Sequence, residues 1–258
     1  MKVSLVQLDA GTDWRHEELA DWLAQAPPAD LVVFPESYPF WRSAGINHRT
    51  AIARLEAAAQ QHPERSFIAG GYVADEGHDS TRILRNRSYL VHGGHVVDTY
   101  DKQVVFQNEQ FCPGQIVKLF AWGAHRCLPL ICADADTGPE ADFMASLVRR
   151  ARAAGAGPGV PIIVSSFGAM LTEPYWTESL HHLANTLNAS VLICGIAGTS
   201  TTTFIYSIED GGDGKRHPYG GGGSGLFIPN KSEPKQYTEP GFVTVDLDTL
   251  QTRWRAFR

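Results

Sequence analysis

Short apolar runs alternate along the chain with segments whose apolar residues recur at helical spacing. The runs are rich in β-branched and aromatic residues and are bounded by Gly, Pro or Asp, which predicts strands. They span residues 31–36, 65–73, 87–102, 126–132, 160–166, 190–198, 224–229 and 242–248. Helical spacing predicts helices over residues 14–26, 48–61, 139–155 and 174–188. Strands and helices in alternation indicate a layered α/β fold.

Features near the N-terminus, in the middle and near the C-terminus of the chain indicate how many domains it forms. Residues 1–9, MKVSLVQLD, alternate like a strand and lack the continuous apolar region of a signal peptide. LVHGGHVVD predicts a hairpin with Gly93 and Gly94 at its turn. The glycine-rich tract 210–225 is predicted to be a flexible loop and not a domain boundary, because the strands after it are too few to stand alone. We therefore expect a single domain over residues 1–258.

Composition narrows the classes of protein. The chain has 258 residues, is 43% hydrophobic and carries a net charge of -6, which argues against nucleic-acid or anionic-membrane binding. No stretch is long and apolar enough to span a membrane, so a soluble cytoplasmic protein is expected. In a reducing compartment the four cysteines are expected to be free thiols, with two of them in the core. The cysteines are Cys112, Cys127, Cys132 and Cys194, and the core pair is Cys127 and Cys194.

Three predicted strands end on a chemically reactive side chain. LVVFP leads to Glu36, VVDTY to Asp101 and Lys102, and LPLI to Cys132. Strand ends are where layered α/β domains build their sites. A thiol nucleophile, a carboxylate base and an ammonium for the oxyanion are a working set for acyl transfer. Each residue also has an ordinary structural explanation, as a turn glutamate, a surface lysine or a core cysteine. The spacing alone does not decide between the catalytic and the structural explanation.

Other motifs in the chain indicate no metal and no cofactor. There is no HExxH sequence, and the adjacent His181 and His182 point in different directions on a helix. Gly220, Gly222 and Gly225 have dinucleotide-fingerprint spacing but precede a strand instead of a helix.

Taken together, the three segments resemble the nitrilase superfamily, the carbon–nitrogen hydrolases. LVVFPES resembles the glutamate segment of that family, TYDKQVVFQNEQFCPG its lysine segment and LPLICADAD its nucleophile segment. Their order and spacing also match, and the resemblance covers nearly the whole chain, including the RNRSYLV segment before the lysine. It implies a four-layer αββα sandwich that pairs through its outer helices into a homodimer or a larger homo-oligomer.

The resemblance also implies a role for each matched residue. Cys132 corresponds to the nucleophile, Glu36 to the general base and Lys102 to the oxyanion stabiliser. The backbone N–H of Ala133 assists at the oxyanion, and Glu109 orients the lysine and the substrate. The implied activity is hydrolysis of a non-peptide C–N bond, in an amide or carbamoyl group of a small molecule. It proceeds through a thioester on the cysteine and releases ammonia or an amine.

Departures from the family pattern affect which branch of the nitrilase superfamily the chain resembles. CADADTGPE has Asp136 where the family often has Arg, and HLANTLN replaces its Arg-Ala-x-Glu-Asn helix segment. True nitrilases usually carry Trp after the cysteine, so Ala133 favours amide-type substrates. The alternatives are a true nitrilase, an acyltransferase with the same triad, and an inactive scaffold. The complete set of four matched residues disfavours the scaffold.

The substrate is expected to contact the loops at residues 37–47 and 165–176. For the aromatic residues among them, packing against helices or a subunit interface is an equal alternative. The predicted substrate-binding residues are Tyr38, Trp41, Asp134, Phe167, Tyr175 and Trp176.

Overall fold

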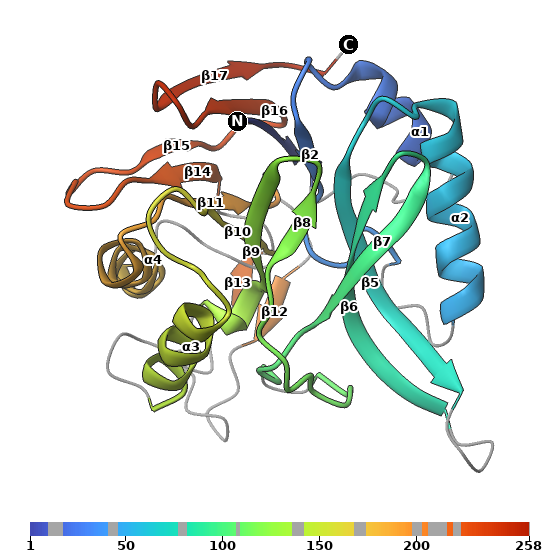
Figure 1. Ribbon diagram of the computed structural model, residues 1–258, viewed down its shortest axis with the longest axis horizontal. Helices are drawn as coiled ribbons and strands as arrows, with labels where there is room; N and C mark the ends of the chain where they lie inside the picture. Colours follow the sequence, from blue (N-terminus) through green and yellow to red (C-terminus); the bar gives the residue numbers. More distant parts are fainter. Residues whose placement is uncertain are drawn as a thin grey trace.

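Two β-sheets face each other, and helices cover their outer faces (Figure 1). The computed structural model describes residues 1–9, 18–40, 46–76, 82–106, 109–135, 142–167, 174–197, 203–205, 216–218 and 223–257. Helices α1 (Glu18–Gln25) and α2 (His48–Gln61) lie on the first sheet. Helices α3 (Asp142–Ala153) and α4 (Pro174–Leu187) lie on the second. The layers therefore follow the predicted order, helix–sheet–sheet–helix.

The first sheet has the strand order β17-β16-β1-β2-β5-β6-β7, with β3 and β4 also paired to β5. Strands β1, β2 and β5 are parallel, whereas β5, β6 and β7 are joined antiparallel. Two antiparallel steps return β7 to the direction of β5, so β2, β5 and β7 end at the same edge. The strands are β1 Lys2–Gln7, β2 Leu31–Val33, β3 Pro39–Phe40, β4 Ile46–Asn47, β5 Phe67–Glu76, β6 Arg82–His92, β7 His95–Asp101, β16 Gly241–Asp246 and β17 Gln251–Arg255.

The second sheet has the order β15-β14-β11-β10-β9-β8, and its central strands β9, β10 and β11 are parallel. A short 3₁₀ turn, η1 (Cys132–Asp134), follows β9 directly. Strands β12 (Thr203–Ile205) and β13 (Arg216–Pro218) pair separately. The remaining strands are β8 Phe120–Trp122, β9 His125–Ile131, β10 Ile162–Ser165, β11 Val191–Cys194, β14 Ser224–Phe227 and β15 Lys235–Tyr237.

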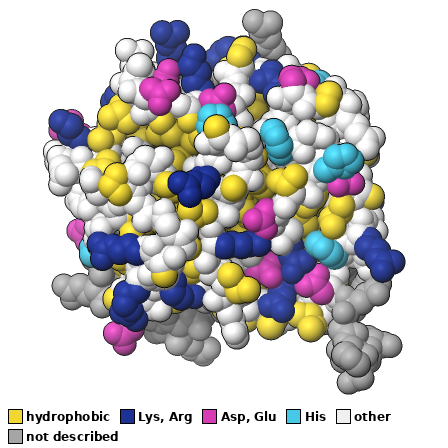
Figure 2. Space-filling view, in the orientation of Figure 1, with side chains coloured by type: hydrophobic (Ala, Val, Ile, Leu, Met, Phe, Trp, Pro, Cys, Tyr) yellow, Lys and Arg dark blue, Asp and Glu magenta, His cyan; other side chains and the backbone are white. Residues whose placement is uncertain are grey.

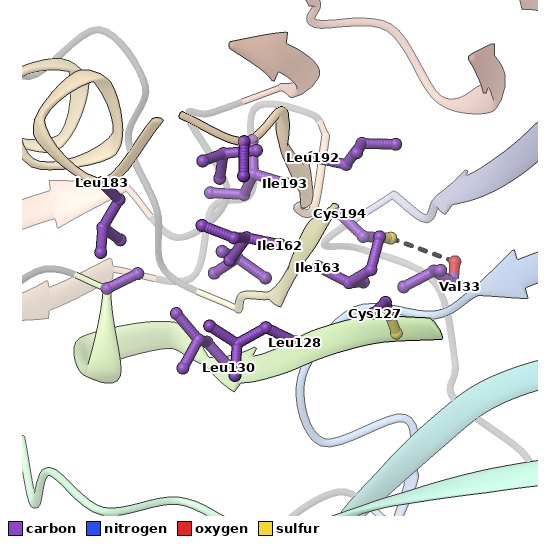
Figure 3. Close-up of a cluster of buried hydrophobic side chains, with 14 of the residues drawn as sticks. Val33, Cys127, Leu128, Leu130, Ile162, Ile163, Leu183, Leu192, Ile193 and Cys194 are labelled. Carbon is purple, nitrogen blue, oxygen red and sulfur yellow. Dashed lines mark hydrogen bonds between the residues drawn. The ribbon is translucent and has the colours of Figure 1, made fainter. Parts of the chain in front are cut away.

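The largest hydrophobic core lies between the sheets and continues under α3 and α4. Successive side chains of β2 point to opposite faces of the sheet. Leu31 and Val33 therefore lie in this core, whereas Val32 packs with α1 and α2. Figure 3 shows Cys194 of the second sheet pointing at Val33 of the first, where its thiol donates a hydrogen bond of 3.2 Å to the Val33 carbonyl. Cys127 and Cys194 are fully buried, as predicted, and all four cysteines are free thiols.

The predicted elements agree with the structure where local chemistry fixes their ends. Helix α2 covers the predicted residues 48–61, and the Asn47 side chain caps it by accepting a hydrogen bond from the Arg49 N–H. The predicted hairpin turn is confirmed, because Gly93 and Gly94 have φ values of 59° and 83°. Figure 2 shows acidic and basic side chains interspersed on one face of the molecule, consistent with the mixed charges along the sequence.

Several elements differ from the prediction. Strand β2 ends at Val33, three residues before the predicted end, because Pro35 has no N–H for a ladder and Ser37 turns the chain with a φ of 66°. Several short strands were not predicted, namely β3, β4, β8, β12, β15 and β17. Part of the tract 210–225 forms β13 and the start of β14, so a loop is the wrong prediction there. The rest of that tract, up to residue 222, lies outside the described residues.

We predict that Gly71→Ala strongly destabilises the fold. Gly71 has a φ of +144°, and a Cβ there would lie 2.5 Å from the Phe40 carbonyl oxygen where β3 meets β5. A strained backbone conformation and an overpacked contact each cost about 1–3 kcal/mol, so the free energy of unfolding should fall by about 2–5 kcal/mol. Urea denaturation measures it.

The matched control is Gly93→Asn. Gly93 has a φ of +59°, a Cβ added there would have no atom within 4 Å, and Asn tolerates that backbone region well. Its unfolding free energy should change by less than about 1 kcal/mol. Equal destabilisation by the two substitutions would contradict the close approach of β3 to β5.

Candidate active site

The carboxyl ends of strands from both sheets converge on one group of polar side chains. Glu36 follows β2 and Lys102 follows β7 in the first sheet, while Cys132 follows β9 and Ser166 follows β10 in the second. The Lys102 ammonium lies 2.9 Å from Glu36 Oε1. The structure thus places the predicted glutamate and lysine together. The second sheet reaches them at the end of β10, where the Phe167 N–H donates to Glu36.

Lys102 is a buried cation in the site. Its side chain is 1% exposed, and Nζ donates to Glu36 Oε1 at 2.9 Å and to both Glu109 oxygens at 2.8 Å. Burial by itself lowers the pKa of Lys102, but Glu36, Cys132 and Glu109 outweigh burial and hold this pKa well above its usual range. The Phe111 ring lies 5.7 Å from Nζ. Lys102 is therefore a permanent cation at neutral pH.

The two carboxylate oxygens of Glu36 differ in their hydrogen bonds, and Oε1 has more of them than Oε2. Oε1 accepts hydrogen bonds from Asn86 Nδ2 at 2.8 Å and from Lys102 at 2.9 Å. Within the described part of the chain, Oε2 accepts only the Phe167 N–H, at 3.2 Å. A carboxylate oxygen has two in-plane lone pairs. Among the described residues, none donates to the second lone pair of Oε2.

Glu109 accepts hydrogen bonds from several donors besides Lys102. Its Oε1 also accepts the Tyr72 hydroxyl at 2.8 Å, and its Oε2 accepts the Phe106 N–H at 2.9 Å. Burial, together with Glu36 and Glu109, raises the pKa of Tyr72 well above its usual range, so the phenol remains a donor.

Sequence reasoning missed two residues of this network, Asn86 and Tyr72. Asn86 lies on β6 within the RNRSYLV segment, which contributes to the family resemblance but to which no site residue was assigned. Tyr72 lies on β5, where an aromatic residue is an ordinary strand former. Asn86 comes directly before the strand predicted over residues 87–102, so no local pattern indicated that its amide is buried and needs partners.

Cys132 lies at a strained turn with its thiol protonated. It has a φ of 43°, in the left-handed region that costs a non-glycine residue about 1–3 kcal/mol. Burial, reinforced by Glu36, raises the pKa of the Cys132 thiol well above its usual range, although Lys102 opposes the rise. The Ser166 hydroxyl donates to Sγ at 3.6 Å. Ala133, predicted to assist at the oxyanion, follows in the same turn.

Asp134 has a different role from the predicted one. It is fully buried, and Oδ1 accepts the N–H groups of Gln103 and Val104 at 2.8 and 2.9 Å. Oδ2 accepts the Tyr100 hydroxyl at 2.9 Å and the Ile131 N–H at 3.2 Å. The prediction that Asp134 binds the substrate is wrong, because protein donors occupy both of its oxygens.

The bonds of Asp134 join the segment after Lys102 to the segment that leads into Cys132. Two of them hold the chain just after Lys102, and another holds the residue just before Cys132. Burial raises the pKa of Asp134 to about 6, against the opposing effects of Lys102 and the bound N–H groups. Asp134 therefore fixes the nucleophile turn relative to the lysine.

The predicted aromatic lining is only partly placed. Tyr38 is fully buried and stacks on Phe34 with ring centroids 5.1 Å apart, in the core beneath α1 and α2, so its predicted contact with substrate is wrong. Trp176 is 5% exposed and packs in the core beneath α4, which agrees with the packing alternative. The Phe167 backbone reaches Glu36, and its ring as a lining group stays a prediction. Trp41 and the Tyr175 side chain lie outside the described residues.

Metal sites and membrane spans are both absent from the part of the chain that the structure describes. Among those residues, no group of three or more His, Cys, Asp or Glu side chains could hold a metal ion. None of the helices in the described ranges is long and apolar enough to cross a membrane.

Known structures share this fold. No protein-family model matches the chain, and no curated protein sequence matches it. The amidase from Nesterenkonia sp. is 20% identical, with a TM-score of 0.67 over 96% of this chain and 90% of that chain. A cysteine-to-alanine mutant of the Nesterenkonia AN1 amidase, described as a nitrilase-superfamily protein, gives a TM-score of 0.68 with the same identity and coverage. This chain therefore has the fold of the nitrilase-superfamily amidases, the αββα sandwich.

A third structure shows a covalent adduct of that amidase. It is a mutant of the Nesterenkonia AN1 enzyme in which acrylamide has undergone Michael addition to the active-site cysteine. It is also 20% identical, with a TM-score of 0.67 over 96% of this chain and 93% of that chain.

We predict that Asp134→Asn destabilises the protein and impairs the site. The Asn amide would turn one oxygen into a donor that faces two existing donors. Each buried donor left unsatisfied costs about 1–3 kcal/mol, so the free energy of unfolding should fall by about 2–5 kcal/mol. Denaturant unfolding followed by Trp fluorescence measures this.

Tyr100→Phe is the matched control. It removes one donor to Asp134 and leaves three, so it should cost only about 0.5–1.5 kcal/mol. A cost for Asp134→Asn no larger than that for Tyr100→Phe would show that Asp134 does not join the two segments.

Proposed function

We propose that this chain is a thiol hydrolase of the nitrilase superfamily. It cleaves a non-peptide C–N bond, in an amide or carbamoyl group of a small molecule, through a thioester on Cys132. One observation carries the proposal. The buried Lys102 ammonium is bound between Glu36 and Glu109, where the ends of β2 and β7 meet the end of β9, which leads into Cys132. The likeness to an amidase of known structure supports it.

Acylation begins with the thiol. Because burial keeps Cys132 protonated, a base must take its proton as Sγ attacks the substrate carbonyl carbon. Glu36 Oε2, whose second lone pair accepts from no described residue, receives that proton. The carbonyl oxygen becomes an oxyanion stabilised by the Lys102 ammonium and the Ala133 N–H. All three N–H bonds of Lys102 point at carboxylates at rest, so one of them is exchanged for the oxyanion.

Breakdown of this intermediate releases the amine. Glu36 gives its proton to the leaving nitrogen, the C–N bond breaks and a thioester remains on Cys132. Water then attacks the thioester, and Glu36 Oε2 takes the proton of that water. The C–S bond breaks, the electron pair returns to sulfur and Glu36 returns the proton to it. From an amide the products are a carboxylic acid and ammonia or an amine. From an N-carbamoyl group they are an amine and carbamic acid, which decomposes to carbon dioxide and ammonia. In both cases the enzyme regains its starting state.

Small primary amides are the proposed starting point for substrates. The alanine at position 133 supports amides over nitriles, through the family resemblance. In the Nesterenkonia amidase, acrylamide reaches the active-site cysteine. A pocket of that scale would admit small amides here too.

We predict that ammonia release from small amides, ω-amides or N-carbamoyl compounds depends on Cys132. Cys132→Ala should reduce release to background, because the substituted side chain cannot form a thioester. Cys112→Ala removes an exposed thiol instead and should leave the rate unchanged. Ammonia is measured enzymatically across the panel, with nitriles included.

Lys102→Met should lower kcat by at least about 10²–10³-fold, the usual cost of losing an oxyanion donor.

Full activity in Cys132→Ala would refute the thiol mechanism. Turnover of nitriles alone would identify a nitrilase. No ammonia from any compound, while Cys132 still reacts with iodoacetamide, would refute the hydrolase assignment and point to an acyl acceptor other than water.

A further inference from the structure

The carboxyl end of β10 brings two donors into the site that the proposed triad does not include. The Ser166 hydroxyl donates to Cys132 Sγ at 3.6 Å, and the next residue, Phe167, donates its N–H to Glu36 Oε2 at 3.2 Å. Ser166 is fully buried, and its own N–H donates to the Cys194 carbonyl at 2.8 Å. This backbone bond continues the pairing of β10 with β11, so the sheet itself fixes where the hydroxyl lies.

We propose that Ser166 is a further catalytic residue, whose hydroxyl stabilises negative charge on the Cys132 sulfur whenever that charge develops. The inference rests on the proposed function, because it takes Cys132 as the nucleophile. From sequence, this segment was expected only to shape the substrate pocket.

The surroundings of the sulfur explain why such a donor is needed. Glu36 disfavours a thiolate by its own negative charge, and Lys102, the nearby cation, is already bound to two carboxylates. A neutral hydroxyl donates to the thiolate without adding charge or giving up its proton. Hydrogen bonds to a charged atom are about twice as strong as those between neutral groups.

The charge develops twice in each cycle. In acylation, the thiol proton moves to Glu36 Oε2 while the S–C bond forms, and the sulfur is partly anionic in the transition state. In deacylation, the S–C bond breaks and its electron pair returns to sulfur before Glu36 returns the proton. The Ser166 proton remains on its oxygen throughout. The hydroxyl therefore stabilises both transition states more than the neutral thiol or thioester, which raises kcat and leaves KM unchanged.

Ser165 provides a matched control for this effect. It precedes Ser166 on β10 and is also buried, at 4% exposure. Successive side chains of a strand point to opposite faces, so the Ser165 side chain points away from the sulfur. Ser165→Ala removes the same atoms from a similarly buried site on the other face.

The test compares Ser166→Ala with Ser165→Ala, both made in a Cys112→Ala background so that no other exposed thiol reacts. Iodoacetamide alkylation of Cys132 is followed by mass spectrometry from neutral to mildly alkaline pH, and kcat and KM are measured on the best amide substrate. Ser166→Ala should slow alkylation and lower kcat by about tenfold each, with KM unchanged. Ser165→Ala should remain within about twofold of the parent in all three measurements.

Wild-type alkylation and kcat in Ser166→Ala would overturn the proposal, and so would equal losses in the two variants, which would indicate packing alone. If Ser166→Ala does not fold, Ser166→Gly removes the same hydroxyl and is judged by the same criteria. Amide hydrolysis that survives in Cys132→Ala would overturn the proposed function as a whole. Loss of hydrolysis in Cys132→Ala with normal rates in Ser166→Ala would overturn only the role of Ser166.

Discussion

The site depends on one buried ammonium held by two carboxylates. An ammonium that is 1% exposed is stable only when opposite charges and hydrogen bonds replace its water. Glu36 and Glu109 supply both, at 2.8 to 2.9 Å. Each carboxylate is in turn held by its own donors, Asn86 for Glu36 and Tyr72 for Glu109. Because every member needs its neighbours, the arrangement is fixed before any substrate binds.

This constraint explains several features of the fold around the site. Strands β2, β5 and β7 run in the same direction, so Glu36 and Lys102 follow their strands at one edge of the sheet. Tyr72, within β5, donates to Glu109 there. Asp134 then ties the chain after Lys102 to the turn that carries Cys132. The glycine at position 71 allows β3 to approach β5 closely beside this group. The backbone of both sheets is thus adapted to hold four reactive side chains together.

The same constraint sets the resting state of the nucleophile. A permanent cation favours a thiolate, but its charge is already shared by two carboxylates, and burial dominates at the sulfur. The resting thiol is therefore neutral and needs both a base and a local donor when it reacts. Glu36 Oε2 fits the first need and the Ser166 hydroxyl fits the second, and both reach the site from strand ends.

The sequence by itself determined the layered α/β class, most helix and strand positions and the three reactive strand ends. Apolar periodicity and capping residues such as Asn47 act locally, so they can be read from the chain. The family resemblance added the sandwich fold and Glu109. Only the tertiary structure decided that Asp134 and Tyr38 are fully buried, and that Asn86, Tyr72 and Ser166 contact Glu36, Glu109 and Cys132, respectively. The physical reason is that hydrogen bonds between residues distant in sequence depend on how sheets pack and register, which no local pattern encodes.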